Sequence, residues 1–172
     1  MFKWMRVSLN KDEGFTLVEL MVVVLIIAIL IAIAIPTFLG ARERAQDRAA
    51  QSNLRNALTS AKVHYTDTEN FSDGAVADVT AAQLIAIEPS LAFKAGPITI
   101  PAPAGNPEVG YVVESVVAGD RQIITFTAYS ESGKTFGLKD VSSGAGSGTY
   151  YCVDATATDV TFNSADCVAG SW

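Results

Sequence analysis

Histidine, cysteine and charged side chains are all scarce in this 172-residue chain, and each scarcity excludes a class of protein. One histidine and two cysteines are too few for a zinc finger or a histidine-rich metal site. Charged residues make up only 17% of the chain, and the net charge is −6. This composition excludes a basic nucleic-acid-binding domain and a disordered polyelectrolyte. The length allows one domain, or one domain with an appendage.

Catalytic signatures are missing as well. The single histidine, His64, lies in a predicted helix, where a surface or packing role is expected. The glycine-rich stretch 144–148 lacks the Lys-Ser/Thr of a phosphate-binding loop, and neither G-x-S-x-G nor H-E-x-x-H occurs. Calcium ligation is conceivable for three C-terminal carboxylates, although a solvated acidic loop is the simpler interpretation: Asp154, Asp159 and Asp166. We therefore expect no enzyme, no cofactor and no metal.

Hydrophobic residues, in contrast, make up 49% of the chain and are concentrated near its N-terminus. The segment from Phe15 to Ile35 contains only two polar residues, Thr16 and Glu19, and everything from Leu20 onward is apolar. As a helix this segment would span about 32 Å, close to the ~30 Å hydrocarbon core of a bilayer. The sequence therefore predicts a helix that can cross a membrane.

Length and hydropathy leave three interpretations of this segment open. It can be a signal peptide, with Leu20–Ile31 as its apolar core and Ala32-Ile33-Ala34 as a small-x-small cleavage site. It can be an uncleaved anchor, or it can be cut between Gly14 and Phe15 with the apolar helix retained. Three basic residues precede the segment and three follow it closely, so the positive-inside rule does not decide the orientation.

Glu19 favours the third interpretation. A carboxylate within a lipid-embedded segment costs a few kcal/mol or more unless it is neutralised or paired. A helix N-terminus favours a carboxylate at a water-exposed end, but here apolar residues lie on both sides. A cut after Gly14 would create a new α-amine at Phe15, mostly cationic at neutral pH, four residues from the carboxylate. On this argument Glu19 has a purpose only if the chain is cut there.

The hexapeptide Gly14-Phe15-Thr16-Leu17-Val18-Glu19, followed by MVVVLIIAILIAIAIP, resembles the type III signal sequence of type IV pilins and pseudopilins. The resemblance covers about 50 residues, up to Tyr65. It implies that a membrane aspartic peptidase, the prepilin peptidase, cuts after Gly14 and that the new terminal Phe15 is N-methylated. It also implies that Glu19 pairs with a neighbouring subunit's N-terminus during assembly, and Pro36 falls where the family commonly has a proline.

The same resemblance implies a function and a location. The expected protein is a structural pilin, a fimbrial subunit held in the inner membrane as a single-pass precursor and then polymerised into a cell-surface filament. Its implied partners are other copies of itself, the membrane, the prepilin peptidase, and the pilus assembly platform with its ATPase, with no nucleic acid assigned. The alternative is the major pseudopilin of a type II secretion system. A membrane-anchored or secreted enzyme is the third, least supported hypothesis.

A second, amphipathic helix pattern follows the apolar segment. Residues 41–65 lack proline and glycine, and an apolar stripe recurs at spacings of three and four: Leu54, Ala57, Leu58, Ala61 and Tyr65. A continuous helix from residue 15 to 65 would be about 75 Å long, with a kink or local opening at Pro36. A charged cluster opens this second half and predicts either a solvated face or a contact with neighbouring subunits: Arg42, Glu43, Arg44, Asp47 and Arg48.

The remaining residues predict a small head. Thr80 and Gln83 fit a capping box that opens a short helix ending before Pro89, and a loop precedes it. Four prolines in 97–107 indicate a stiff connector without strands. Three strands with hairpin loops at 118–120 and 130–133 are expected at 111–117, 122–129 and 134–140. In the second strand an apolar face should pack on the amphipathic helix: Ile124, Phe126 and Ala128.

The expected fold class is therefore α+β, a long N-terminal helix packed against a small antiparallel sheet. We expect a leader at 1–14, a membrane and filament-core helix at 15–39, and an extracytoplasmic head at 40–172. Cys152 and Cys167 can be buried core thiols, but in a chain with an export signal a disulfide is the better interpretation. Their position also resembles the C-terminal disulfide-bounded loop of many type IV pilins, which would place the head in an oxidising space.

Overall fold

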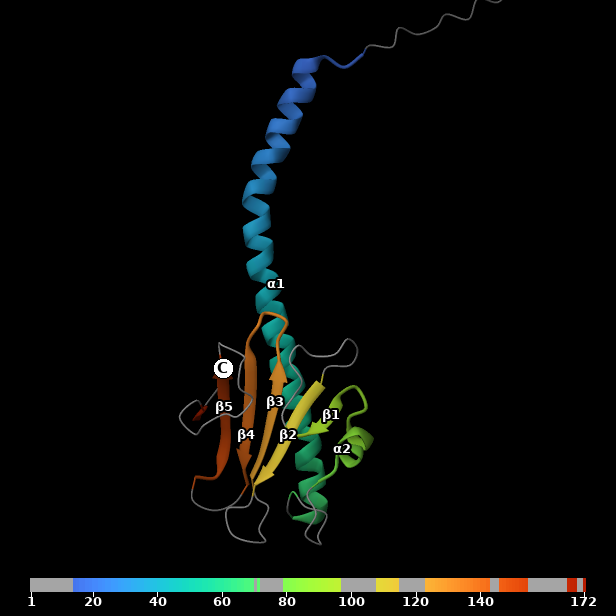
Figure 1. Cartoon of the computed structure of the whole chain (residues 1–172), viewed down its shortest axis with the longest axis vertical. Coiled ribbons are helices and arrows are strands. Elements are labelled where there is room, and N and C mark those ends of the chain that lie inside the picture. Colours follow the sequence, from blue (N-terminus) through green and yellow to red (C-terminus); the bar gives the residue numbers. More distant parts are fainter. Residues whose placement is uncertain are drawn as a thin grey trace, which may run out of the picture. The chain divides into compact units, whose positions relative to one another are not determined.

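The computed structural model describes residues 14–69, 71, 79–96, 108–114, 123–142, 146–154, 167–169 and 172 (Figure 1). The chain divides into two compact units, Met1–Ala41 and Arg42–Trp172. Helix α1 (Leu17–Thr68, 52 residues) contributes to both units, and all other elements belong to the second. The fold is α+β, as predicted.

The N-terminal part of α1 makes up the described residues of the first unit. The helix begins at Leu17, two residues later than the motif suggested, and it continues without interruption through Pro36. A proline inside a helix removes one backbone donor. One residue further on, the Thr37 hydroxyl donates a 2.6 Å hydrogen bond to the carbonyl oxygen of Ile33, so this turn carries an extra side-chain hydrogen bond.

A six-stranded sheet in the order β1-β2-β3-β4-β5-β6 forms the second unit together with α2 (Ala81–Ile87) and the C-terminal part of α1. The strands are β1 (Ala92–Ala95), β2 (Glu108–Glu114), β3 (Ile123–Tyr129), β4 (Thr135–Val141), β5 (Gly148–Asp154) and β6 (Cys167–Ala169). Neighbouring strands are antiparallel except β1 and β2, which are parallel. The sheet is therefore larger than the three predicted strands, and one of its edges is mixed.

The hairpin between β3 and β4 is well defined by its register. Tyr129 pairs with Thr135, and the loop between them closes with a 2.8 Å hydrogen bond from the Ser130 N–H to the Lys134 carbonyl oxygen. Gly133 has a φ of 95°, a backbone conformation that glycine adopts without the steric cost paid by other residues. The predicted loop at residues 130–133 is confirmed.

The core lies between α1 and one face of the sheet. From α1 it takes Leu54, Ala57 and Ala61 of the predicted stripe and also Ala50, with the predicted Leu58 and Tyr65 partly buried against them. From β3 it takes the predicted triplet Ile124, Phe126 and Ala128, all at most 2% exposed. Alternate positions on β2 and β4 complete this face: Val109, Tyr111, Val113, Phe136 and Leu138.

Several predicted boundaries were wrong in detail. The first helix extends to Thr68 rather than Tyr65, and β2 begins three residues before its predicted start. The capping box of α2 is confirmed, because Thr80 Oγ1 accepts from the Gln83 N–H and Gln83 Oε1 accepts from the Thr80 N–H. Strands β1, β5 and β6 were not predicted. The proline-rich connector and the expected hairpin loop at 118–120 lie outside the described residues.

Candidate processing and assembly site

The residues of the expected processing site lie at the exposed start of α1. Gly14, Phe15 and Thr16 precede the helix, and Phe15 is 92% exposed. Thr16 is the residue before the first helical position, and Glu19 stands three residues after it. The Thr16 N–H donates to Glu19 Oε2 at 2.9 Å, and the Glu19 N–H donates to Thr16 Oγ1 at 3.2 Å. These reciprocal bonds form a capping box.

This capping box corrects the interpretation of Glu19 made from sequence. Glu19 was assigned a purpose only after cleavage, but the uncut chain already gives it a partner. Glu19 Oε2 accepts from both the backbone N–H and the hydroxyl of Thr16, the latter at 2.8 Å. Within the described part of the chain, Glu19 Oε1 has no hydrogen bond. The carboxylate is therefore fixed by its own helix and keeps one oxygen for a further donor.

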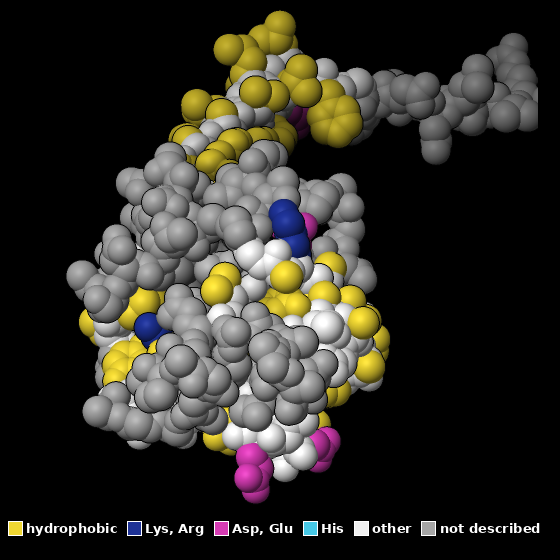
Figure 2. Space-filling model, turned by 60° about the horizontal axis from the view of Figure 1, so that its bottom comes forward, with side chains coloured by type: hydrophobic (Ala, Val, Ile, Leu, Met, Phe, Trp, Pro, Cys, Tyr) yellow, Lys and Arg dark blue, Asp and Glu magenta, His cyan; other side chains and the backbone are white. Residues whose placement is uncertain are grey.

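The apolar side chains that follow are uncovered in the single chain. The segment has a mean hydropathy of 3.3 over an 18-residue window, and none of that window is buried inside the molecule. By length and composition, this one helix of the described chain can cross a membrane. The hydrophobic side chains of this segment visible in Figure 2 form a nearly continuous surface. Such a surface needs lipid or protein around it.

Asp47 corrects a second prediction, because it is neither on a solvated face nor free for a neighbouring subunit. It is buried against the loop between β3 and β4, and Lys134 Nζ donates to its Oδ2 at 2.8 Å. Ser130 Oγ donates to Oδ1 at 2.8 Å, and Ser132 Oγ also donates to Oδ1. Burial would raise the pKa of Asp47, but the hydrogen bonds from Lys134, Ser132 and Ser130 outweigh it and lower the pKa.

A second carboxylate joins α1 to the sheet with the charges reversed. Asp140 on β4 has a side chain only 4% exposed, and Lys62 Nζ on α1 reaches its Oδ1 at 3.1 Å. The hydroxyls of Thr149 and Ser142 donate to the two oxygens of Asp140 at 2.9 and 2.8 Å. A buried carboxylate with this many donors is compensated for its loss of water.

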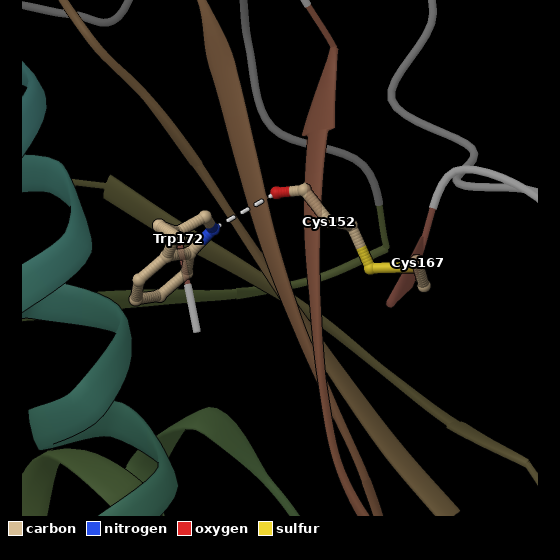
Figure 3. Close-up of a disulfide and its surroundings, with 3 residues drawn as sticks. All are labelled: Cys152, Cys167 and Trp172. Atoms are coloured by element: carbon tan, nitrogen blue, oxygen red, sulfur yellow. Dashed lines mark hydrogen bonds between the residues drawn. A yellow bond between two sulfur atoms is a disulfide. The ribbon is translucent and has the colours of Figure 1, made fainter. Parts of the chain in front are cut away.

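The two cysteines lie directly opposite each other on β5 and β6 and form a disulfide (Figure 3). Their Cα atoms are 4.2 Å apart, and Cys152 is fully buried. The expected pairing is therefore present, although both cysteines belong to strands and not to the loop between them. That loop, with Asp159 and Asp166, lies outside the described residues.

Trp172 packs beside this strand pair, a role that no local sequence pattern indicates. Its indole N–H donates to the Cys152 carbonyl oxygen at 3.1 Å (Figure 3). Its ring meets Tyr151 and Phe136 edge to face, at centroid distances of 4.7 and 6.1 Å. The Arg55 guanidinium carbon lies 4.9 Å from the ring centroid, so Trp172 connects α1 to the disulfide-bearing edge of the sheet.

His64 has the packing role expected of it, since it is 8% exposed and its Nδ1 lies 3.4 Å from Thr68 Oγ1. Tyr65 of the predicted stripe packs against the buried Phe71, with ring centroids 4.9 Å apart. Within the described ranges, no group of three or more His, Cys, Asp or Glu residues is placed to hold a metal ion.

Comparison with known proteins agrees with the geometry at the N-terminus. Residues 9–35 match the family of the prokaryotic N-terminal methylation motif. A 63-residue stretch is 44% identical to the type IV major pilin protein PilA of Myxococcus xanthus. By these two matches, the N-terminal part of the chain is similar to type IV pilins.

The similarity to PilA covers only one part of each protein. The matched stretch covers 37% of this chain and 29% of the length of PilA. No solved structure gives a significant match. The description of the head therefore rests on the structure of this chain alone.

Proposed function

We propose that the chain is the structural subunit of an extracellular type IV pilus-like filament. In this proposal residues 1–14 are a leader removed by the prepilin peptidase, and Phe15 becomes the methylated terminus. Residues 15–39 lie first in the inner membrane and then in the filament core, and residues 40–172 form the extracytoplasmic head. The subunit has no catalytic role. The observation that carries the proposal is the wholly uncovered apolar surface of α1, most of which lies within the matched residues 9–35.

The same surface can serve in both environments. Apolar side chains gain little by leaving lipid for protein, because lipid tails are as apolar as Leu and Ile. Packing against other copies of α1 also keeps this surface away from water, but it gains little free energy over burial in lipid. The direction in which subunits add, and their register along the filament, must then come from polar groups. Pro36 marks one fixed position on α1, because it lacks the backbone N–H donor that its neighbours have.

Glu19 is the polar group that supports pairing between subunits. Thr16 occupies one carboxylate oxygen, so a neighbour's Phe15 amine can approach Oε1 without breaking the capping box. A charge pair at low dielectric is strongly favourable compared with the two ions left unpaired. Glu19 in this proposal keeps its helix start and recruits the next subunit at the same time. The pilus assembly platform and its ATPase would drive the addition.

The test is electron microscopy of sheared cell-surface material, with mass spectrometry of the subunit in it. We expect filaments built from a chain that starts at N-methylated Phe15. A chain that starts at Ile35 would support a signal peptide, and processed chain without surface filaments would support the pseudopilin role. The Cys152–Cys167 disulfide favours the pilin role, because it resembles the closed tail of many pilins.

A further inference from the structure

Three arginines follow the apolar part of α1 and have no assigned role. Arg42, Arg44 and Arg48 are all exposed, and we call them the arginine collar. Arg44 and Arg48 are four residues apart and share a helix face, whereas Arg42 points in another direction around the axis. The collar therefore presents guanidinium groups on more than one side of the helix.

The acidic groups near the collar form no ion pair with it. Asp47 lies among these arginines in sequence, but Lys134, Ser130 and Ser132 occupy its two oxygens. Glu131, on the loop that packs against this part of α1, accepts a 2.7 Å hydrogen bond from the neutral side chain of Gln46 and keeps its charge. None of the three arginines has an ion pair with a described residue. The three positive charges thus stand unpaired, with Glu43 and Glu131 as acidic neighbours, on a chain whose net charge is −6.

The distance along α1 places the start of the collar near the level of lipid phosphates. At 1.5 Å per residue, the 25 steps from Leu17 to Arg42 amount to about 38 Å of helix, and Arg48 lies about 9 Å further along. A bilayer measures roughly 40–45 Å including its headgroups. With Phe15 at one boundary of the hydrocarbon core, long arginine side chains on the far side reach back to the headgroups, as such side chains do at interfaces.

We propose that the arginine collar binds the phosphate groups of anionic phospholipids in the leaflet on the side of the head. This rests on the proposed function only in requiring that α1 spans a membrane. A planar guanidinium donates two parallel hydrogen bonds to a phosphate, and anionic lipid attracts basic residues close to its surface. The collar would hold the unassembled subunit at a fixed depth, and these contacts must break when it leaves the membrane.

The test uses the full chain reconstituted into phosphatidylcholine vesicles with and without phosphatidylglycerol. Spin-labelled phosphatidylglycerol and phosphatidylcholine report by electron spin resonance which lipid is immobilised by the protein. We expect the wild type to prefer phosphatidylglycerol, by up to ~5-fold for each arginine that contacts a phosphate, and high salt to weaken this preference. The triple variant R42Q/R44Q/R48Q should lose it, and R42K/R44K/R48K should retain most of it because the charge remains.

Two results would overturn the lipid assignment. One is a wild type without preference for phosphatidylglycerol, and the other is a glutamine variant that keeps the preference. If that variant keeps the preference but forms no filaments, the arginines contact neighbouring subunits. Membrane insertion and the mass of the processed chain are measured on the same samples, so a failure of the proposed function is seen separately from a failure of lipid binding. Thermal unfolding of the variants checks that the head is intact.

Discussion

Asp47 on α1 and Lys134, the residue before β4, form an ion pair of 2.8 Å. A second ion pair further along the helix and the strand has the opposite polarity. There the lysine, Lys62, is on the helix and the carboxylate, Asp140, is on the strand, 3.1 Å apart. The 15 residues that separate Asp47 from Lys62 correspond to about 22 Å of helix. The six residues between Lys134 and Asp140 correspond to about 20 Å of strand. The two pairs thus match at a single register of α1 along β4.

The first prediction concerns the stability of this register. Asp47→Ala should lower the free energy of unfolding by ~2 kcal/mol, because it leaves two serine hydroxyls and Lys134 without their shared acceptor. Half-exposed Lys134 can turn to water, which keeps the cost below that of a fully buried pair. Urea unfolding of the processed chain in detergent, followed by Trp172 fluorescence, measures it.

The matched control is Glu131→Gln on the same loop. Its carboxylate is exposed and accepts one hydrogen bond from Gln46, so the change should cost less than about 0.5 kcal/mol. Equal losses in Asp47→Ala and Glu131→Gln would show that the loop, and not the buried carboxylate, sets the stability.

The second prediction is the pH dependence of the same contact. The pKa of Asp47 is lower in the folded chain than its ordinary value of ~3.9, since hydrogen bonds from Lys134 and the two serines outweigh burial. The stability that Asp47 contributes is therefore fully present above that ordinary value and is lost as the pH falls through the lower folded pKa. The difference in unfolding free energy between wild type and Asp47→Asn should be constant down to about pH 5 and should shrink as the pH falls from about pH 5 to about pH 2. A difference that stays constant over this range would exclude a titrating Asp47.

These contacts also mark the limit of what the sequence could predict. The helix stripe at Leu54, Ala57 and Ala61 and the capping box at Thr80 follow from local spacing, and both were found by that route. The burial of Asp47 depends on Ser130 and Lys134, more than 80 residues away. No local pattern separates such a carboxylate from a solvated neighbour like Glu43.

The strands that were missed are those with the weakest patterns. Four residues form β1 and three form β6, too few for alternation to be visible. In β5 the positions paired with Asp140, Leu138 and Phe136 of β4 are Thr149, Tyr151 and Val153, a mixed set in which Val153 is 44% exposed. At the N-terminus, Thr16 and Glu19 have the T-x-x-E spacing of a capping box, but this box was not predicted. Only the preference of a helix N-terminus for a carboxylate was considered there, and it was set aside because apolar residues lie on both sides.

The third prediction concerns the disulfide. Reduction of Cys152–Cys167, or replacement of both cysteines by alanine, should destabilise the head by about 3 kcal/mol in the chain-entropy model for a loop of this size. Alkylation of the non-reduced, exported protein followed by mass measurement should find no free thiol. Labelling of both cysteines under those conditions would contradict the disulfide.

The fourth prediction separates the two contributions of Trp172. Trp172→Phe keeps a ring against Tyr151 but removes the bond to the Cys152 carbonyl, and we expect a loss of ~1 kcal/mol. Trp172→Ala removes the packing on α1 as well and should cost ~3 kcal/mol. Unfolding is followed here by circular dichroism. If the two variants lose the same free energy of unfolding, the ring contacts do not contribute to the stability of the head.

The last prediction concerns Glu19, which caps its own helix and in our proposal also pairs with a neighbour's amine. One substitution cannot separate these two roles. Glu19→Ala removes the carboxylate that would meet a neighbour's amine, and it also removes one half of the capping box. We expect normal synthesis, membrane insertion and cleavage after Gly14 but a sharp fall in filament yield. Glu19→Asp should retain part of the yield, because its charge survives with a shorter reach.

The matched control is Thr16→Val, which breaks the hydroxyl bonds of the box and leaves the Glu19 carboxylate in place. Loss of a capping residue costs only ~1 kcal/mol, a small effect for a helix held by lipid over its length. Thr16→Val should therefore assemble far better than Glu19→Ala, as measured by filament yield in sheared fractions relative to processed subunit in membranes. If both variants fail to the same extent, Glu19 acts through the start of its own helix, and pairing with a neighbour's amine is not needed to explain it. If Glu19→Ala is not cleaved, the carboxylate serves the peptidase, because the missing filaments then follow from missing processed subunit.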